Sequence, residues 1–211
     1  MKIVTTEEMK EIERICETEY GLTEALIIEN VGFNAAKYLR EKYLSPTPHG
    51  ELVFLIGRGN NGADGLAIAR QLRAFDLRIR CFLLFPLDVC SKELKKQLHM
   101  AQKYGVKISE IRSEDQLYSY FTQTQEHYFV VDAIFGTGVR LPLSEFIFKT
   151  IQMCNDFADV MISIDIPSGI EGDSGHVRGL CIQATETLAI GLPKVGHYMP
   201  QGVQNSGTVS V

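Results

Sequence analysis

The stretch LVFLIGRGNNGADG, residues 52–65, joins an apolar run to a glycine-rich loop and decides the fold class. An unbroken apolar run of this kind is typical of a parallel strand buried on both faces. Residues 57–62 fit G-x-G-x-x-G, the pattern of a dinucleotide-binding turn that opens a helix. The same loop carries Asn60, Asn61 and Asp64, although a loop that holds phosphate normally avoids negative charge. The stretch therefore predicts a strand, a turn and a helix, and leaves the chemistry of the loop open.

Strand-like and helix-like segments alternate through the rest of the chain. Two helices are expected first, one opened by a capping box of Thr5 and Glu8 and one from about 23 to 43. The expected strands are 52–57, 79–85, 106–111, 128–135, 160–164 and 187–190, and the helices between them are 63–75, 91–104, 114–123 and 144–154. Residues 207–211 look like the start of a further strand.

These elements predict the fold class. Strands that alternate with helices of about 10 to 15 residues imply right-handed βαβ units and a parallel sheet. We therefore predict a single three-layer αβα Rossmann-like domain over residues 1–211, with a mostly parallel sheet and the two leading helices packed on it. In such a sheet, ligands bind beyond the carboxyl ends of the strands. The loops that follow the strands are thus where functional side chains are expected.

Composition limits the functional class. The net charge is −5 and no dense basic stripe occurs, which argues against nucleic-acid binding. Five scattered cysteines without C-x-x-C spacing suggest neither a disulfide framework nor a zinc site, so a reducing cytoplasm is expected. No stretch approaches the roughly 20 apolar residues needed to cross a membrane. We expect a cytoplasmic protein with a small-molecule ligand, no nucleic acid and no membrane.

The glycine-rich loop meets half of the requirements for a redox cofactor. That interpretation needs an acidic residue at the end of the second strand, to hold the ribose hydroxyls. The strand ends FLLFP at 82–86 with no acid before Asp88, and Asp76 precedes the strand. A phosphate-binding P-loop fails because no lysine follows Gly62. The structural alternative is a tight turn in which Asp64 caps the helix.

Two other strand ends carry aspartates. Asp132 interrupts the run VVDAIFGTG at 130–138, and Asp165 ends a strand in SIDIPSGIEGDSG at 163–175, with Ser168 close behind. A buried carboxylate costs energy unless it is paired or binds a cation. Oxygen ligands for a hard cation and a general acid or base are the two roles that suit them, and capping of loop amides is the alternative. No His or Cys joins the group at ligand spacing, so zinc is not expected.

A fourth feature is LPKVGHYMPQG, residues 192–202. Lys194 is suited to face a ligand phosphate or to assist a proton transfer, and the alternative is a surface lysine in a turn. His197 is a weaker candidate. The remaining histidines, expected on the surface or in loops, are His49, His99, His127 and His176. Neither a G-x-S-x-G elbow nor an H-E-x-x-H motif is present, so hydrolase interpretations lack support.

The motifs GRGNNGADG, DAIFGTG and DIPSGIEGDSG, in this order at successive strand ends, resemble the NAD(P)HX epimerases, the family of YjeF N-terminal domains. The segment ALIIENVG at 25–32 and the PKVGHY turn also look like that family. The resemblance covers essentially the whole chain, and the three motifs together are specific. It implies an isomerase for cofactor repair, which interconverts the R and S epimers of hydrated NADH and NADPH so that a dehydratase can restore the S form.

The resemblance also implies roles for residues. Asp165 would act at the reacting ring as a general acid or base, assisted by Lys194. A potassium ion would be held near Asn61, Asp132 and Ser168. The residues expected to bind substrate, besides Asp165, are Asn60, Asn61, Gly62, Ala63, Asp64, Gly136, Thr137, Gly138, Val139, Arg140, Leu141 and Pro142.

Two departures from the family pattern stand out. Ala63 occupies a position that is commonly glycine, which is tolerated unless φ must be positive there. Leu141 stands where a small residue, usually glycine, is expected, so the shape of the second loop is open.

The resemblance also implies a homodimer and a fused or separate ADP- or ATP-dependent NAD(P)HX dehydratase. The chemical route of epimerisation and the choice between NADHX and NADPHX are not decided by the sequence. The rival interpretations are a non-catalytic Rossmann-like nucleotide-binding or scaffold domain, and an oxidoreductase.

Overall fold

The computed structural model describes residues 2–44, 50–123, 127–138 and 143–211. A seven-stranded sheet with the order β3-β2-β1-β4-β5-β6-β7 runs through this part of the chain, and each neighbouring pair is parallel. The strands are β1 Glu51–Ile56, β2 Ile79–Leu83, β3 Lys107–Glu110, β4 Tyr128–Ala133, β5 Ala158–Ile164, β6 Glu186–Leu188 and β7 Thr208–Ser210. The predicted parallel sheet is confirmed.

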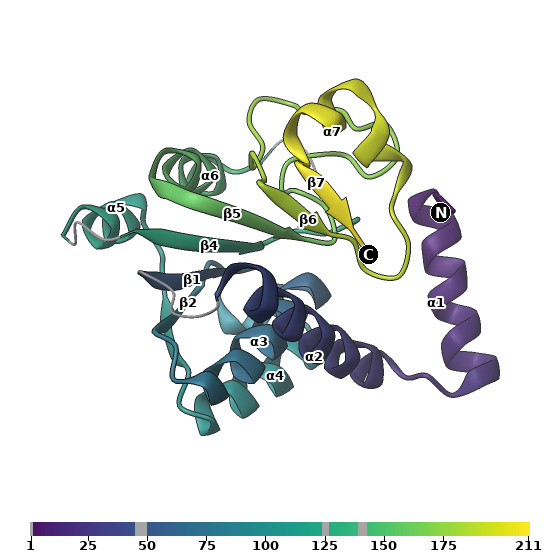
Figure 1. Cartoon of the computed structure of the whole chain (residues 1–211), viewed down its shortest axis with the longest axis horizontal. Helices are drawn as coiled ribbons and strands as arrows, with labels where there is room; N and C mark the ends of the chain where they lie inside the picture. Colours follow the sequence, from purple (N-terminus) through teal and green to yellow (C-terminus); the bar gives the residue numbers. More distant parts are fainter. Residues whose placement is uncertain (1, 45–49, 124–126, 139–142) are drawn as a thin grey trace.

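Helices cover both faces of the sheet, which gives the three predicted layers (Figure 1). Helices α2, α3 and α4 pack on one face, and α5 and α6 pack on the other. The helices are α1 Thr6–Tyr20, α2 Glu24–Tyr43, α3 Asn60–Leu72, α4 Lys92–Lys103, α5 Glu114–Gln123, α6 Glu145–Phe157 and α7 Pro200–Asn205. Short 3₁₀ turns occur at Arg73–Phe75, Leu87–Val89 and Val195–Tyr198. No helix within the described residues is both long and apolar enough to span a membrane.

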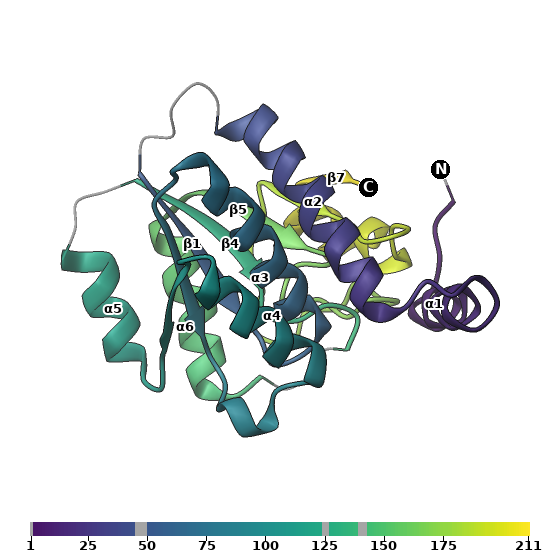
Figure 2. The same cartoon turned by 90° about the horizontal axis from the view of Figure 1, so that it is seen from below.

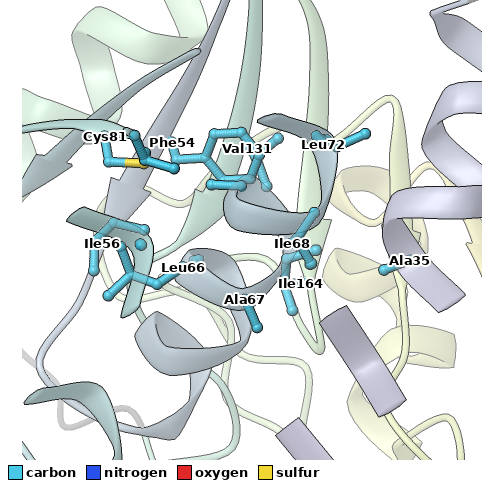
Figure 3. Close-up of a cluster of buried hydrophobic side chains, with 14 of the residues drawn as sticks. Ala35, Phe54, Ile56, Leu66, Ala67, Ile68, Leu72, Cys81, Val131 and Ile164 are labelled. Carbon is cyan, nitrogen blue, oxygen red and sulfur yellow. The ribbon is translucent and has the colours of Figure 1, made fainter. Parts of the chain in front are cut away.

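The core confirms that β1 is buried on both faces. Successive side chains of a strand point to opposite sides. Phe54 and Ile56 therefore face the helical layer of α2, α3 and α4, while Val53 and Leu55 face α5 and α6. Figure 3 shows Ile56 beside Leu66 of α3, and Phe54 between Cys81 and Val131, within the first cluster. The apolar run of the sequence is the centre of both cores.

Helices α2 and α3 pack closely at Gly32. A Cβ atom placed on Gly32 would lie 2.7 Å from the Cβ of Ala67. We predict that Gly32→Val lowers the free energy of unfolding by about 1–3 kcal/mol, because the two helices must move apart. Urea denaturation measures the loss. Lys37→Val, at an exposed position of the same helix, controls for helix propensity, and equal losses in both variants would contradict the prediction.

The strand bounds differ from the prediction by up to two residues, and helices α3 and α7 differ as well. Helix α3 begins at Asn60 rather than at 63, because Gly59 is its extended N-cap and the amide of Ala63 already bonds to the Gly59 carbonyl at 3.1 Å. The alternative in which Asp64 caps this helix is wrong, since Asp64 lies inside the helix. Helix α7 is not predicted by the sequence. Pro200 occupies its first position, where proline is tolerated.

Helix α1 is attached to the rest of the molecule near its start. The amide of Val4 donates to the Pro193 carbonyl at 3.0 Å, and the Val195 amide donates to the Val4 carbonyl at 2.9 Å. Thr6 donates its amide to Asp173 at 2.6 Å. Of the residues of α1, all of them described, Met9 is the buried one. Figure 2 shows α1 at one end of the molecule, beyond the start of α2.

All five cysteines are free thiols, in line with the absence of a disulfide framework in the prediction. His99, His127 and His176 are exposed, as predicted, and His49 lies outside the described residues. The assignment of residues 1–211 to a single domain stays a prediction.

Candidate functional site

The site lies where the order of the strands changes direction. Strand β1 pairs with β2 on one side and with β4 on the other. The connections from these strands lead to opposite faces, which opens a crevice at their carboxyl ends. A cleft of about 580 Å³ occupies this place, and its lining includes Asn61 after β1, Gly136 after β4 and Asp165 after β5. The three polar strand ends of the sequence therefore do meet at one edge of the sheet.

The first loop presents the start of α3 to the cleft. Its N-cap, Gly59, offers no side-chain oxygen to the free amides of the first turn. Asn61 is 9% exposed, and neither its Oδ1 nor its Nδ2 has a hydrogen-bond partner within the described residues. A buried polar group without a partner costs about 1–3 kcal/mol. The Asn61 amide and the first-turn amides are thus available to a ligand.

Asp165 adopts an unusual main-chain conformation. Its φ is +69°, in the left-handed region that non-glycine residues rarely adopt. Its amide donates to the Leu188 carbonyl at 2.8 Å, which ties the end of β5 to β6. A strained residue held in this way directs its side chain to a defined place, and such residues cluster at functional sites.

Lys194 forms an ion pair with Asp165. The ammonium of Lys194 donates to Oδ1 of Asp165, and also to the Ile190 carbonyl at 2.7 Å. Lys194 is 1% exposed, whereas the Asp165 side chain is 13% exposed. The alternative of a surface lysine is therefore wrong. The pair presents its carboxylate to the cleft and keeps its ammonium behind it.

The second loop wraps around the same carboxylate. The amide of Thr137 donates to Oδ2 of Asp165 at 3.2 Å. A Cβ on Gly136 would lie 2.6 Å from that Oδ2 atom, so a side chain at this position would displace the aspartate. The loop after β4 and the aspartate after β5 therefore form one unit.

Asp132 lies beneath the cleft in a closed hydrogen-bond network. Its carboxylate accepts the Ser168 hydroxyl at 2.6 Å, the Ser168 amide at 2.8 Å, the Ser163 hydroxyl at 2.9 Å and the Ile134 amide at 3.2 Å. Burial raises the pKa of Asp132, and the hydrogen bonds from Ser168 oppose that rise. The amide-capping alternative is thus confirmed for Asp132. The network joins the ends of β4 and β5.

Two further carboxyl groups line the cleft near the ion pair. Asp64 of α3 is 8% exposed and has no hydrogen-bond partner among the residues that the structure describes. Burial raises its pKa well above the usual value, and the charges of Asp165 and Glu13 raise it further. The pKa of Glu13, on α1, is also raised by desolvation and by Asp165. Burial and neighbouring carboxylates therefore favour the protonated form of both Asp64 and Glu13.

The predicted substrate-binding residues fall into three groups. Those that line the cleft are Asn60, Asn61, Asp64, Gly136, Thr137, Gly138 and Asp165, and Lys194, predicted as a catalytic residue, lines it as well. Gly62 and Ala63 are buried in the first turn of α3 and do not line it. Ala63 is helical, without a positive φ, so alanine is tolerated there. The remaining predicted positions, Val139, Arg140, Leu141 and Pro142, lie outside the described residues.

The structure brings together only part of the set of residues predicted to hold a potassium ion. Ser168 and Asp132 are hydrogen-bonded beneath the cleft and do not line it. Asn61 lines the cleft and lies beside Gly136, as its side-chain carbon is 3.6 Å from a Cβ placed there. Within the described ranges, no group of three or more His, Cys, Asp or Glu side chains is placed to hold a metal ion.

The cleft contains residues that sequence reasoning missed. Lys10 and Glu13 reach it from α1, whose sequence carries a capping box but no motif of a ligand site, so no sequence signal could have found them. Phe85 ends the segment after β2, where a redox enzyme would carry an acid, and Arg58 lies 5.6 Å above its ring. Phe135 packs edge-on against Phe85 at 6.0 Å between ring centroids. The aromatic residue at the end of that strand was the one sequence feature that could have indicated its place in the cleft.

The arrangement suits proton transfer on a polar ligand. A carboxylate backed by an ammonium can accept a proton and, once protonated, donate it, and nearby carboxyls with raised pKa values can exchange one. The fold and the cleft define a Rossmann-like α/β protein whose ligand site lies at the topological switch point. Residues 24–196 match the family described as YjeF-related protein N-terminus, and the chain belongs to that family.

Relatives with curated names agree with this membership. The chain is 33% identical over 211 residues to a protein of Thermofilum pendens named bifunctional NAD(P)H-hydrate repair enzyme Nnr, and spans 40% of its length. It is 30% identical over 197 residues to a protein of Elusimicrobium minutum named NAD(P)H-hydrate epimerase, covering 93% of this chain and 88% of that one.

Among solved structures, the crystal structure of yeast ynu0, YNL200c, matches with a TM-score of 0.80 and 23% identity. The match covers 94% of this chain and 84% of the yeast chain. At this level of identity it shows the fold, and it confirms the predicted fold class.

Proposed function

We propose that the protein is an epimerase that interconverts the R and S forms of hydrated NADH and NADPH. The observation that carries the proposal is the Asp165–Lys194 ion pair, which faces a cleft between two glycine-rich loops. The family supports it, as do relatives named for the epimerase reaction alone, of which one is matched over 88% of its length. Three relatives named as bifunctional NAD(P)H-hydrate repair enzymes are longer, and the chain spans 40% of the length of each.

The cleft has room for part of a dinucleotide. Its volume of about 580 Å³ falls within the range of small-molecule sites, roughly 300–1,000 Å³. The uncapped start of α3 and the guanidinium of Arg58 suit the pyrophosphate, because helix N-termini bind anions. The hydrated ring would then lie at Asp165, where the proton-transfer groups are.

The reaction needs proton transfer and no redox step. The two epimers differ at the carbon that bears the added hydroxyl, beside the ring nitrogen. Opening the ring takes the hydroxyl proton and returns one to nitrogen, and loss of the hydroxyl needs a proton on the leaving oxygen. In this proposal Asp165 takes the hydroxyl proton and returns one to nitrogen when the ring opens, or protonates the leaving oxygen when the hydroxyl is lost. Lys194, its ion-pair partner, stabilises its charged form. The absence of a ribose-binding acid after β2 is consistent with this chemistry.

We propose a potassium ion between the cleft and the Asp132 network. Hard cations take oxygen ligands, and Oδ1 of Asn61 is buried without a partner within the described residues. Asp132 is a fully buried carboxylate whose hydrogen-bond partners are neutral, so a cation nearby would supply the missing positive charge. Ser168 and Asp132 would then both orient the oxygen atoms that bind the ion and bind the ion themselves.

Potassium is predicted to stabilise the folded protein as well as to raise its activity. The midpoint of thermal unfolding is measured in potassium chloride and in choline chloride of equal ionic strength. A bound ion adds stability that reaches about 2.7 kcal/mol at a hundredfold excess over Kd. Asp132→Asn should lower the affinity for potassium by about 10–100-fold, as the loss of a supporting group near a metal does. Identical midpoints in the two salts would refute the potassium site.

The proposal extends to assembly and location. A homodimer, a fused or separate dehydratase dependent on ADP or ATP, and a cytoplasmic location belong to it. Relatives named as bifunctional repair enzymes support the dehydratase, and five free thiols suit a reducing compartment. Exposed Leu26 and Phe33 on α2 offer apolar surface to a second copy. The alternative is a nucleotide-binding scaffold without catalysis.

Epimer exchange tests the function directly. Purified R-NADHX is mixed with the protein, and its conversion to the S epimer is followed by chromatography. Acceleration over the spontaneous rate is expected. Binding without acceleration would favour the scaffold, and neither binding nor acceleration would reject both.

A further inference from the structure

His197 connects the two members of the ion pair through their main chains. It lies in the 3₁₀ turn Val195–Tyr198 and is 1% exposed. Its Nδ1 accepts the amide of Lys194 at 3.0 Å, and its Nε2 faces the Asp165 carbonyl at 2.9 Å. Because an amide can only donate, Nδ1 must be unprotonated and Nε2 carries the proton that is donated to Asp165. A single neutral ring thus bonds to both residues.

Both bonded residues need such support. Asp165 has a left-handed φ of +69°, a conformation that costs a non-glycine residue roughly 1–2 kcal/mol. Besides its amide bond to Leu188, its main chain is held by the bond from His197. Lys194 lies in a bend after β6, with its neighbours Pro193 and Val195 bonded to Val4. The ring fixes the distance between these two segments.

The 3₁₀ turn that carries His197 is itself fixed. The Gly196 amide donates to the Gly172 carbonyl at 2.7 Å. A Cβ on Gly196 would lie 2.5 Å from the Glu171 carbonyl oxygen, so the two turns are in close contact. The imidazole therefore has a rigid base and cannot follow Asp165 or Lys194 if either moves.

The charged groups around His197 come from three segments. Asp165 and Lys194 face the ring, while Glu171 and Asp173 of the adjoining turn are bonded to Ser174 and Thr6 respectively. Burial lowers the pKa of His197, against the opposing effect of Asp165. A proton on Nδ1 would place two donors against each other and break the bond to Lys194.

We propose that His197 is a positioning residue, which holds the Asp165 and Lys194 side chains in their reactive arrangement by bonding to the main chain of both. The inference rests on the proposed epimerase function. His197 does not line the cleft, so it acts through its two partners.

Two variants separate positioning from plain stability. His197→Leu removes both bonds, and kcat for epimer exchange is expected to fall by about 10²-fold, as a misplacement of about 1 Å can cause, with KM nearly unchanged. His197→Gln can still donate to the Asp165 carbonyl and does not titrate, so it should recover most of kcat. In the wild type, kcat should fall at acid pH as His197 becomes protonated. This fall should be missing from the pH profile of His197→Gln. Circular dichroism establishes the folded fraction of each variant.

A measurement on the wild type does not depend on activity. Nitrogen-15 NMR of the imidazole should show the Nε2–H tautomer and a His197 pKa below 6.5. A pKa depressed in the folded state adds stability above 6.5 that is lost as the pH falls through the folded value. An Nδ1–H tautomer, or wild-type kcat in folded His197→Leu, overturns the inference. If wild-type protein exchanges no epimers while the tautomer is as expected, the proposed function fails instead.

Discussion

Asp165→Asn is expected to lower kcat for epimer exchange by about 10²–10⁴-fold, the range that general acid–base catalysis contributes, without unfolding the protein. An amide cannot accept or release the proton that the carboxylate moves. The substitution suits the site because asparagine, like aspartate, tolerates the left-handed φ of +69° found here. Its single oxygen can still accept from Lys194, while its NH2 group takes the place of the oxygen that accepts from the Thr137 amide. Activity is measured by chromatography of the epimers, and stability by urea unfolding.

Asp165→Ala would confuse two effects. Alanine adopts a left-handed φ with strain, and the unpaired Lys194 ammonium would stay buried behind it. A loss of activity in that variant would mix lost chemistry with local rearrangement. Asp165→Asn with near wild-type kcat would show that Asp165 is not the acid or base, and attention would move to Asp64 and Glu13.

Lys194→Met is expected to reduce both activity and stability. The ammonium is 1% exposed, and its removal leaves the Asp165 carboxylate in the cleft without a counter-charge. Breaking a buried ion pair in this way costs about 3–5 kcal/mol, and the 13% exposure of Asp165 places this pair at the lower end of that range. We expect kcat to fall by about 10²-fold or more, because the charged form of Asp165 loses its stabilisation.

A double-mutant cycle tests the coupling. Asp165→Asn combined with Lys194→Met leaves neither charge unpaired, so the double variant should be more stable than Lys194→Met alone. Lys149→Met is the matched control, because Lys149 pairs with Glu114 and Glu145 on the surface. Its effect should stay within about 0.5 kcal/mol, with unchanged kcat. Additive effects at 165 and 194 would mean that the pair does not act as a unit.

The sequence predicts the sheet and the edge at which the site lies, for a physical reason. Buried parallel strands are apolar throughout, so Asp132 and Asp165 stand out at their ends, and the parallel topology brings those ends together. The exposure of Lys194 could not be predicted, because a turn rich in proline and glycine is normally at the surface. The main chain of Lys194 bridges to that of Val4, a residue 190 positions away in the chain, and the sequence of the turn does not show this long-range contact.

The contributions of Glu13 and His197 could not be read from the sequence either. Glu13 belongs to an ordinary amphipathic helix, and the long-range bonds of Val4 and Thr6 at the start of that helix hold it beside the cleft. His197 acts on main-chain atoms, which leave no trace in the residue pattern. The first turn of α3 was placed three residues late because two asparagines and a glycine are weak helix formers.

The attachment of α1 has a consequence for exchange of its amide protons with solvent. Segments with few buried contacts open locally at a free energy well below that of global unfolding. Helix α1 is joined through Val4 and Thr6 and buries Met9, while β1 is buried on both faces. Amides of α1 are thus expected to exchange by local opening, and those of β1 only when the whole molecule unfolds. Because α1 carries Glu13, one wall of the cleft belongs to a helix that is expected to exchange well before β1 does.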